Sequence, residues 1–134
     1  MIGVLVASHS EEAASGIAKI AKEMSGQGNV PVVGVGGNES GGLGLSVPKV
    51  YRALMALLER CDGVLIVPDI GSSVLASRAA VDMLTPEVMD KVAIANAPIL
   101  EGAMLAAIES FIGSDLAAVL DAAKEAKNLD KSER

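Results

Sequence analysis

The chain has 134 residues, of which 51% are hydrophobic and 21% charged, and its formal net charge is -6. This balance is typical of one compact globular domain and excludes a disordered or collagen-like chain. Only Tyr51 and Phe111 are aromatic, which disfavours base stacking, and the acidic balance disfavours binding to a phosphate backbone. We therefore expect no nucleic acid partner. A phosphoprotein with a basic patch of its own suits this surface better.

Membrane, disulfide and metal signals are also missing from the sequence. No apolar run approaches the ~18 residues that a membrane span requires, and the first residues lack the basic region of a signal peptide. The single cysteine, Cys61, cannot form an intrachain disulfide, and no Cys or His pair has the spacing of zinc ligands. We therefore expect a cytoplasmic protein with no membrane insertion, metal ion or cofactor.

Four short apolar runs rich in β-branched residues predict strands. None shows polar alternation, which indicates strands that are buried on both faces of a parallel sheet. The predicted strands span residues 2–7, 30–35, 63–67 and 91–95.

Five segments with helical periodicity lie between and after these strands. They span about residues 11–24, 46–58, 72–83, 99–112 and 115–123. The large apolar side chains on their inward faces are expected to include Met24, Met83, Met104 and Phe111.

Repeated alternation of strands and helices predicts an α/β fold, a three-layer, doubly wound, mainly parallel sheet with helices on both faces. We expect one domain over residues 1–123 and a charged, exposed and frayed tail over residues 124–134. Ligands of such folds lie beyond the carboxyl ends of the strands, where the strand order switches. The site should therefore be sought at that edge.

His9, the only histidine, follows the first predicted strand and precedes the first predicted helix. The partial positive charge of a helix N-terminus disfavours imidazolium, which keeps one ring nitrogen unprotonated and nucleophilic. The same amides would stabilise an attached phosphoryl group. His9 is thus a candidate phosphoryl acceptor, and the alternative is a structural polar group.

Asp69, Gly71 and Ser72 follow the third predicted strand. Asp69 could accept a hydrogen bond from the other ring nitrogen of His9 and so fix its tautomer, or it could cap the following helix. Gly71 and Ser72 present an amide and a hydroxyl that suit either phosphate oxygens or helix capping.

The glycine-rich segment 34–44 invites a nucleotide-binding interpretation. It lacks the third glycine of G-x-G-x-x-G, and no Gly-Lys-Ser/Thr completes a P-loop. Direct nucleotide binding is therefore disfavoured. Its length favours a mobile loop with a function over a flexible surface loop without one.

Four segments at the predicted strand ends resemble, in this order, the phosphotransferase subunit of the phosphoenolpyruvate-dependent dihydroxyacetone kinase. They are Ser8-His9-Ser10, Gly42-Leu43-Gly44, Asp69-Ile70-Gly71-Ser72 and Ala97-Pro98-Ile99-Leu100-Glu101-Gly102. The match covers Met1 to about Ala123. The resemblance implies an IIA-mannose-like fold and a homodimer.

The resemblance further implies a phosphotransferase in which His9 carries phosphate. The histidine-containing phosphocarrier protein would supply it, and ADP on the nucleotide-binding subunit of the kinase would receive it. Asp69 would support His9, and Ser10, Gly71 and Ser72 would contact the phosphate. No fused phosphocarrier domain follows, so we expect separate proteins to deliver the phosphate.

One position departs from the family. Its members commonly have threonine where this chain has Leu45, followed by Ser46. Either Ser46 replaces that hydroxyl or a phosphate contact is lost. We also expect Leu43, Leu45, Ile70 and Val74 to form an apolar ring that contacts a partner.

Three other functions compete with this one. A mannose-family IIA component would pass phosphate to a IIB partner of a sugar transporter, but its third-strand turn resembles Asp-Leu-x-Gly-Gly-Ser-Pro, unlike the turn that begins here at Asp69. A regulatory module would bind its partner according to the phosphorylation state of His9. A Ser-His-Asp hydrolase is disfavoured because no G-x-S-x-G elbow is present.

Overall fold

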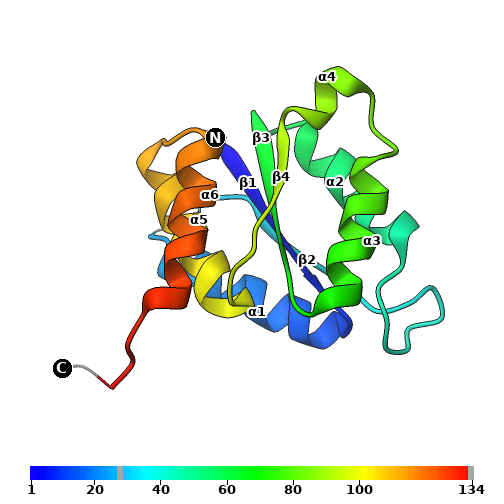
Figure 1. Ribbon diagram of the computed structural model, residues 1–134, viewed down its shortest axis with the longest axis horizontal. Helices are drawn as coiled ribbons and strands as arrows, with labels where there is room; N and C mark the ends of the chain where they lie inside the picture. Colours follow the sequence, from blue (N-terminus) through cyan, green and yellow to red (C-terminus); the bar gives the residue numbers. More distant parts are fainter. Residues whose placement is uncertain (27–28, 133–134) are drawn as a thin grey trace.

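The computed structural model describes residues 1–26 and 29–132. Its centre is a four-stranded, fully parallel sheet with helices on both faces, which confirms the predicted fold class (Figure 1). The strands are β1 (Ile2–Ser8), β2 (Val32–Gly36), β3 (Gly63–Pro68) and β4 (Val92–Ile94), in the spatial order β2-β1-β3-β4.

All five predicted helices are present, and one short helix was not predicted. The helices are α1 (Glu11–Met24), α2 (Val47–Leu58), α3 (Gly71–Val81), α4 (Pro86–Met89), α5 (Ile99–Ile112) and α6 (Leu116–Glu125), followed by the 3-10 turn η1 (Ala126–Asn128). The missed helix α4 has 4 residues, which is too short for an apolar period to be visible in the sequence.

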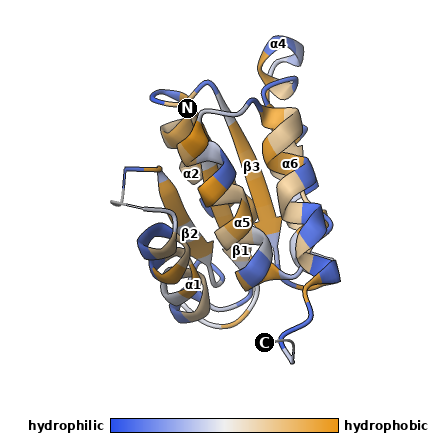
Figure 2. Ribbon diagram, turned by 90° about the vertical axis from the view of Figure 1, so that its left-hand side faces the viewer, coloured by the Kyte–Doolittle hydropathy of each residue, from blue (hydrophilic) through white to orange (hydrophobic). Residues whose placement is uncertain are grey.

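The two faces of the sheet pack against different helices. Alternate side chains of β1 point to opposite faces, as strand geometry requires. Val4 and Val6 join a core cluster with residues of α1, α5 and α6, whereas Leu5 and Ala7 join a cluster with residues of α2 and α3. Figure 2 shows the apolar sheet enclosed between these helices, whose polar residues face outward.

Several large side chains that were predicted to face the core are exposed instead. Met24, Met83 and Phe111 have relative exposures of 59%, 54% and 42%, and Met104 is only half-buried. Alanines occupy the buried ridges of α1 and α5. Helical spacing alone predicted these side chains to face inward, but a helix that lies close to a sheet needs small side chains at the contact.

Two glycines of β2 bring α1 onto the sheet. A β-carbon at Gly34 would lie 2.5 Å from the carbonyl oxygen of Ala14, and one at Gly36 would lie 2.5 Å from that of Ser10. Any larger residue would push the first turns of α1 away from β2. The glycines therefore place the start of α1, and with it His9, against the sheet.

The C-terminal region remains helical past the expected domain end. Helix α6 and η1 together extend to Asn128, and Ala126 is buried. The ammonium group of Lys131 pairs with the carboxylate of Glu101 at the start of α5. The division at residue 123 stays a prediction, and residues 133 and 134 of the expected tail lie outside the described residues. Within the described part of the chain, no helix has the length and apolar character needed to cross a membrane.

The strand order switches between β1 and β3. From β1 the chain moves to β2 on one side, and then crosses to β3 on the other side. In parallel α/β sheets, the carboxyl ends of two such strands border the ligand crevice. Here these ends lead directly into His9 and Asp69.

Candidate functional site

The structure brings the two predicted central residues, His9 and Asp69, into direct contact. Asp69 is placed by its own amide, which donates to the carbonyl oxygen of Ala7 in β1 at 2.9 Å. One carboxylate oxygen of Asp69 accepts from the His9 amide at 3.0 Å, and the other lies 3.0 Å from His9 Nδ1. Both backbone and ring of His9 are therefore held by the same carboxylate.

Further donors surround the Asp69 carboxylate. Ser8 Oγ donates to it at 2.8 Å, the Ile70 amide at 2.7 Å and Ser73 Oγ at 2.5 Å. Burial raises the pKa of Asp69, but the hydrogen bonds from Ser73, His9, Ile70 and Ser8 outweigh burial and hold this pKa well below the ordinary value of 3.8. The carboxylate is therefore ionised at neutral pH and can only accept a hydrogen bond, so the contact with His9 places the ring's hydrogen atom on Nδ1.

The opposite nitrogen of the ring faces the start of α3. With the proton on Nδ1, the lone pair of a neutral imidazole lies on Nε2. Nε2 contacts the hydroxyl of Ser72, and the histidine side chain is 24% exposed. The nucleophilic nitrogen thus points toward a hydroxyl and a helix N-terminus at the protein surface.

The start of α3 carries no side-chain cap. Its N-cap residue is Ile70, and its first turn contains no acidic residue. Asp69 therefore does not cap this helix, which was the alternative role considered for it. An uncapped helix N-terminus offers unpaired amides and a partial positive charge to an anion. The predicted phosphate ligands Gly71 and Ser72 lie there.

The structure places Ser10, the third predicted phosphate ligand, differently. Its hydroxyl accepts from the Ala13 amide at 3.1 Å as the N-cap of α1 and donates to Glu12 at 3.1 Å. The hydroxyl is thus engaged within its own helix. A phosphate-binding role for Ser10 stays a prediction.

Ser73 and Ser8 are site residues that the sequence analysis did not identify. Ser73 is fully buried, and its Oγ lies 2.9 Å from His9 Nδ1 as well as 2.5 Å from Asp69. Its position four residues after Asp69, on the apolar face of a predicted helix, was an available signal, because a buried hydroxyl needs a partner. The sequence offers no comparable signal that the Ser8 hydroxyl would donate to Asp69.

The glycine-rich loop between β2 and α2 touches His9 through its backbone. The amide of Gly44 donates to the carbonyl oxygen of His9 at 2.9 Å. Leu45 is not exposed as expected, because it packs against the core cluster that contains α2. Ser46 caps α2 and donates to Glu39 at 2.6 Å. Its hydroxyl is therefore occupied away from His9.

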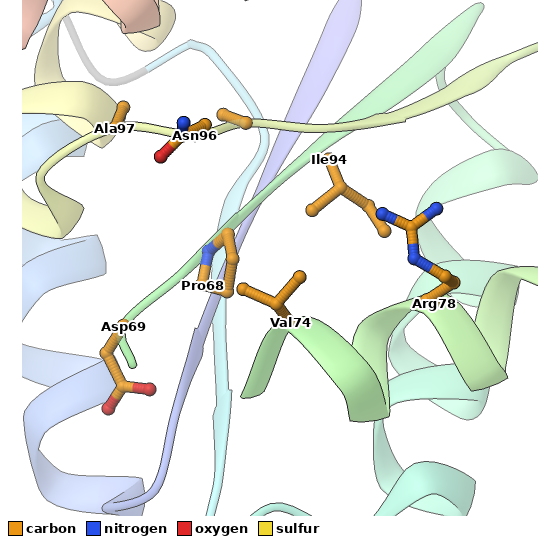
Figure 3. Close-up of a pocket in the computed structure, with 8 residues that line it drawn as sticks. Pro68, Asp69, Val74, Arg78, Ile94, Asn96 and Ala97 are labelled. Carbon is orange, nitrogen blue, oxygen red and sulfur yellow. The ribbon is translucent and has the colours of Figure 1, made fainter. Parts of the chain in front are cut away.

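A cavity of about 240 Å³ lies beside the site, between α3, β4 and the segment that follows β4. Figure 3 shows Asp69 and Arg78 at opposite ends of this cavity, with Pro68 and Val74 between them. His9 does not line it. In residues 1–26 and 29–132, no group of three or more His, Cys, Asp or Glu side chains could hold a metal ion.

Comparison with known proteins shows which family the sequence is similar to. The family model for the fructose IIA component of the phosphotransferase system matches residues 3–120. A phosphoryl donor subunit of phosphoenolpyruvate-dependent dihydroxyacetone kinase 2 from Listeria innocua is 31% identical over 120 residues, which cover 90% of this chain and 94% of the relative. The corresponding kinase subunit from Providencia stuartii is 27% identical over 128 residues, covering 94% of this chain. The chain spans only 27% of that longer relative.

Solved structures share the fold. A protein of unknown function superposes with a TM-score of 0.85 at 28% identity, covering 99% of this chain and 98% of the other. A phosphotransferase system IIA component from Streptococcus agalactiae superposes with a TM-score of 0.71 at 20% identity, covering 98% of both chains. The chain therefore belongs to the IIA component family of the phosphotransferase system, and within it resembles the phosphotransferase subunits of dihydroxyacetone kinases.

Proposed function

We propose that this protein is a phosphohistidine carrier. It takes phosphate on His9 from the histidine-containing phosphocarrier protein and passes it to ADP on the nucleotide-binding subunit of dihydroxyacetone kinase. One observation carries the proposal. Asp69 holds Nδ1 of His9, while Nε2 faces Ser72 and the uncapped start of α3.

Loading begins with the lone pair of Nε2. This nitrogen attacks the phosphorus atom of the donor's phosphohistidine, the new P–N bond forms, and the donor's P–N bond breaks with its electron pair returning to the donor ring. The His9 ring then carries a positive charge, since Nδ1 keeps its proton. The ionised Asp69 offsets that charge through the 3.0 Å contact with Nδ1.

The phosphoryl oxygens would lie at the start of α3. The hydroxyl of Ser72 can donate to one of them, and the first amides of α3 meet the others. Unloading reverses the chemistry, because a β-phosphate oxygen of ADP attacks phosphorus and the bonding pair returns to Nε2. His9 is then neutral again with its proton on Nδ1.

The names of the relatives support this assignment. The similar proteins from Listeria innocua and Providencia stuartii are phosphoryl donor subunits of dihydroxyacetone kinases. The rival function, a IIA component that feeds a IIB transporter partner, shares the family and the fold. Both rest on phosphorylation of His9 and differ in the acceptor.

A two-stage transfer assay tests the proposal. The protein is incubated with the phosphorylated phosphocarrier and examined for acid-labile, base-stable phosphate, and is then mixed with either the ADP-loaded kinase subunit or a IIB protein. We expect loading and ATP formation with the wild type, and no loading with a folded His9→Ala variant. Retention of acid-labile phosphate by that variant would exclude His9. Transfer to IIB but not to ADP would favour the rival function.

The predicted homodimer and cytoplasmic location belong to this proposal as well. Sedimentation of the purified protein tests the first, and fractionation of cells tests the second.

A further inference from the structure

A fully buried hydroxyl lies between the carboxylate of Asp69 and the ring of His9. Ser73 Oγ is 2.5 Å from Oδ1 of Asp69 and 2.9 Å from Nδ1 of His9, and the residue has no exposed surface. Two oxygens this close share a hydrogen atom, and an ionised carboxylate has none to give. The Ser73 hydroxyl therefore donates to Asp69, and only its lone pairs are left for Nδ1.

The hydrogen bonds of Asp69 show why a second acceptor for the ring matters. Each carboxylate oxygen has about two lone-pair sites, but within the described residues three donors converge on Oδ1. The Ser73 hydroxyl lies at 2.5 Å, the Ile70 amide at 2.7 Å and His9 Nδ1 at 3.0 Å. The ring makes the longest of these contacts, so the hydrogen on Nδ1 is shared between Oδ1 and Ser73 Oγ, which is slightly nearer.

These contacts form a chain from the ring to the carboxylate. Nδ1 of His9 donates to Ser73 Oγ, and the hydroxyl of Ser73 donates to Asp69. Hydrogen bonds in such a chain polarise one another, and the low dielectric around a buried hydroxyl strengthens each of them. Positive charge that develops on the ring is therefore stabilised along two routes, directly by Asp69 and through Ser73.

We infer that Ser73 is a positioning residue for phosphoryl transfer, which relays the charge of Asp69 to the His9 ring and keeps Nε2 directed toward Ser72. This inference rests on the proposed function. Ser72 and Ser73 are neighbours in the first turn of α3, and they contact opposite nitrogens of the ring. One helical turn thus holds the ring and also carries the groups that would meet the phosphate.

Helix α3 also contains a matched control. Ser77 lies one turn after Ser73, on the same buried face of the helix, and is fully buried as well. Within residues 1–26 and 29–132, the hydroxyl of Ser77 has no hydrogen-bond partner. Ser77→Ala therefore removes a buried hydroxyl from the same face of α3 without changing a contact of His9 or Asp69.

The first experiment examines the ring in the unphosphorylated protein. Nitrogen NMR spectroscopy of the isotope-labelled ring, at a pH where the ring is neutral, distinguishes a hydrogen on Nδ1 from one on Nε2. We expect the hydrogen on Nδ1, because this nitrogen faces two acceptors. A hydrogen on Nε2 in the wild type would overturn the inference, since Ser73 would then donate to Nδ1 instead of Asp69.

The second experiment measures the equilibrium of phosphoryl exchange between the phosphocarrier protein and His9. It compares the wild type with Ser73→Ala, Ser73→Cys and Ser77→Ala. A thiol has a size similar to that of a hydroxyl but is a weak donor and acceptor. In both Ser73 variants the equilibrium constant for loading should fall about tenfold, because the charged ring loses a hydrogen-bond acceptor. In Ser77→Ala it should stay at the wild-type value.

The outcomes separate the inference from the proposed function. An unchanged equilibrium constant in both Ser73 variants would overturn the inference, because Asp69 alone would then stabilise the ring. An equal loss in Ser77→Ala would also overturn it, since the effect would arise from the packing of α3. Failure of the wild type to accept phosphate would instead refute the proposed function, and with it the role assigned to Ser73.

Discussion

Two helices start beside His9, and their first turns differ. Helix α1 is capped by Ser10 and carries Glu11 and Glu12 in its first turn, whereas α3 has neither a side-chain cap nor an acidic residue there. Carboxylates and a cap satisfy the amides and the partial charge of a helix N-terminus. The anion-binding capacity at this edge therefore lies with α3, although His9 immediately precedes α1.

The serines at the two helix starts have different roles. Ser10 stabilises a helix, while Ser72 and Ser73 contact the two nitrogens of the histidine ring. Four predictions test these two helix starts and the histidine between them, beginning with Asp69, which contacts both Nδ1 and Ser73 Oγ.

Asp69→Asn should have the largest effect. An amide can still accept a hydrogen bond from Nδ1, but it cannot neutralise the positive ring, and such electrostatic support contributes about a hundredfold or more in rate. Rapid-quench measurement of phosphate transfer to His9 checks this, with Asp82→Asn on the exposed end of α3 as the control. Wild-type rates in Asp69→Asn would mean that the carboxylate only organises the turn.

Ser72→Ala removes the hydroxyl next to Nε2 and leaves the backbone amides of α3 in place. A hydrogen bond to a charged group contributes about 1.5–3 kcal/mol, so we expect transfer to slow at least about tenfold, with unchanged thermal stability. The same rapid-quench assay and a melting curve give both readouts. If transfer proceeds at the normal rate, the amides alone hold the phosphate.

Ser10→Ala should show the reverse pattern. Loss of an N-cap typically costs about 1 kcal/mol of folding free energy, so urea unfolding should occur at a lower concentration while the transfer rate changes little. Together with Ser72→Ala, this variant forms a matched pair. A strong loss of transfer in Ser10→Ala would give α1 a part in phosphate binding and remove the distinction between the two helix starts.

The pH dependence of stability should show the smallest effect. The pKa of Asp69 is lower in the folded protein than its ordinary value of 3.8, so ionisation of this group favours the folded state at every pH above that value. The contribution diminishes only as the pH falls below about 4, toward the folded-state pKa. Urea unfolding from pH 7 to pH 3 should therefore show a shallower acid loss in Asp69→Asn than in wild type. Parallel curves would mean that Asp69 has the same pKa in both states.

The sequence predicted those parts of the molecule that depend on local pattern. Buried runs of β-branched residues located the strands. The predicted helices 11–24, 46–58 and 115–123 begin within one residue of the N-caps Ser10, Ser46 and Asp115. The pairing of His9 with Asp69 followed from a general rule, because the ends of adjacent parallel strands meet at one edge.

Features that depend on how closely two elements approach could not be predicted in this way. The alanine ridge of α1 is buried in place of the predicted Met24 because glycines in β2 draw α1 onto the sheet. Helix α5 likewise buries alanines while Phe111 is exposed. The position of Ser73 on the apolar face of the predicted helix could have marked it as a buried hydroxyl, but its contacts with Asp69 and His9 depend on the direction in which α3 leaves β3. Leu45 looked like an exposed loop residue, and only its packing against the core distinguishes it from Leu43.

The contacts of Asp69 and Ser73 with Nδ1 have a stereochemical consequence. The ring cannot turn over without breaking both contacts. In the proposed transfer cycle, Nε2 would therefore both receive and release the phosphoryl group on the same face of the protein. Donor and acceptor must therefore visit in turn rather than together. Each in-line displacement inverts the configuration at phosphorus, and two displacements restore it. A phosphoryl group made chiral with oxygen isotopes would accordingly reach ATP with the handedness it had on the donor.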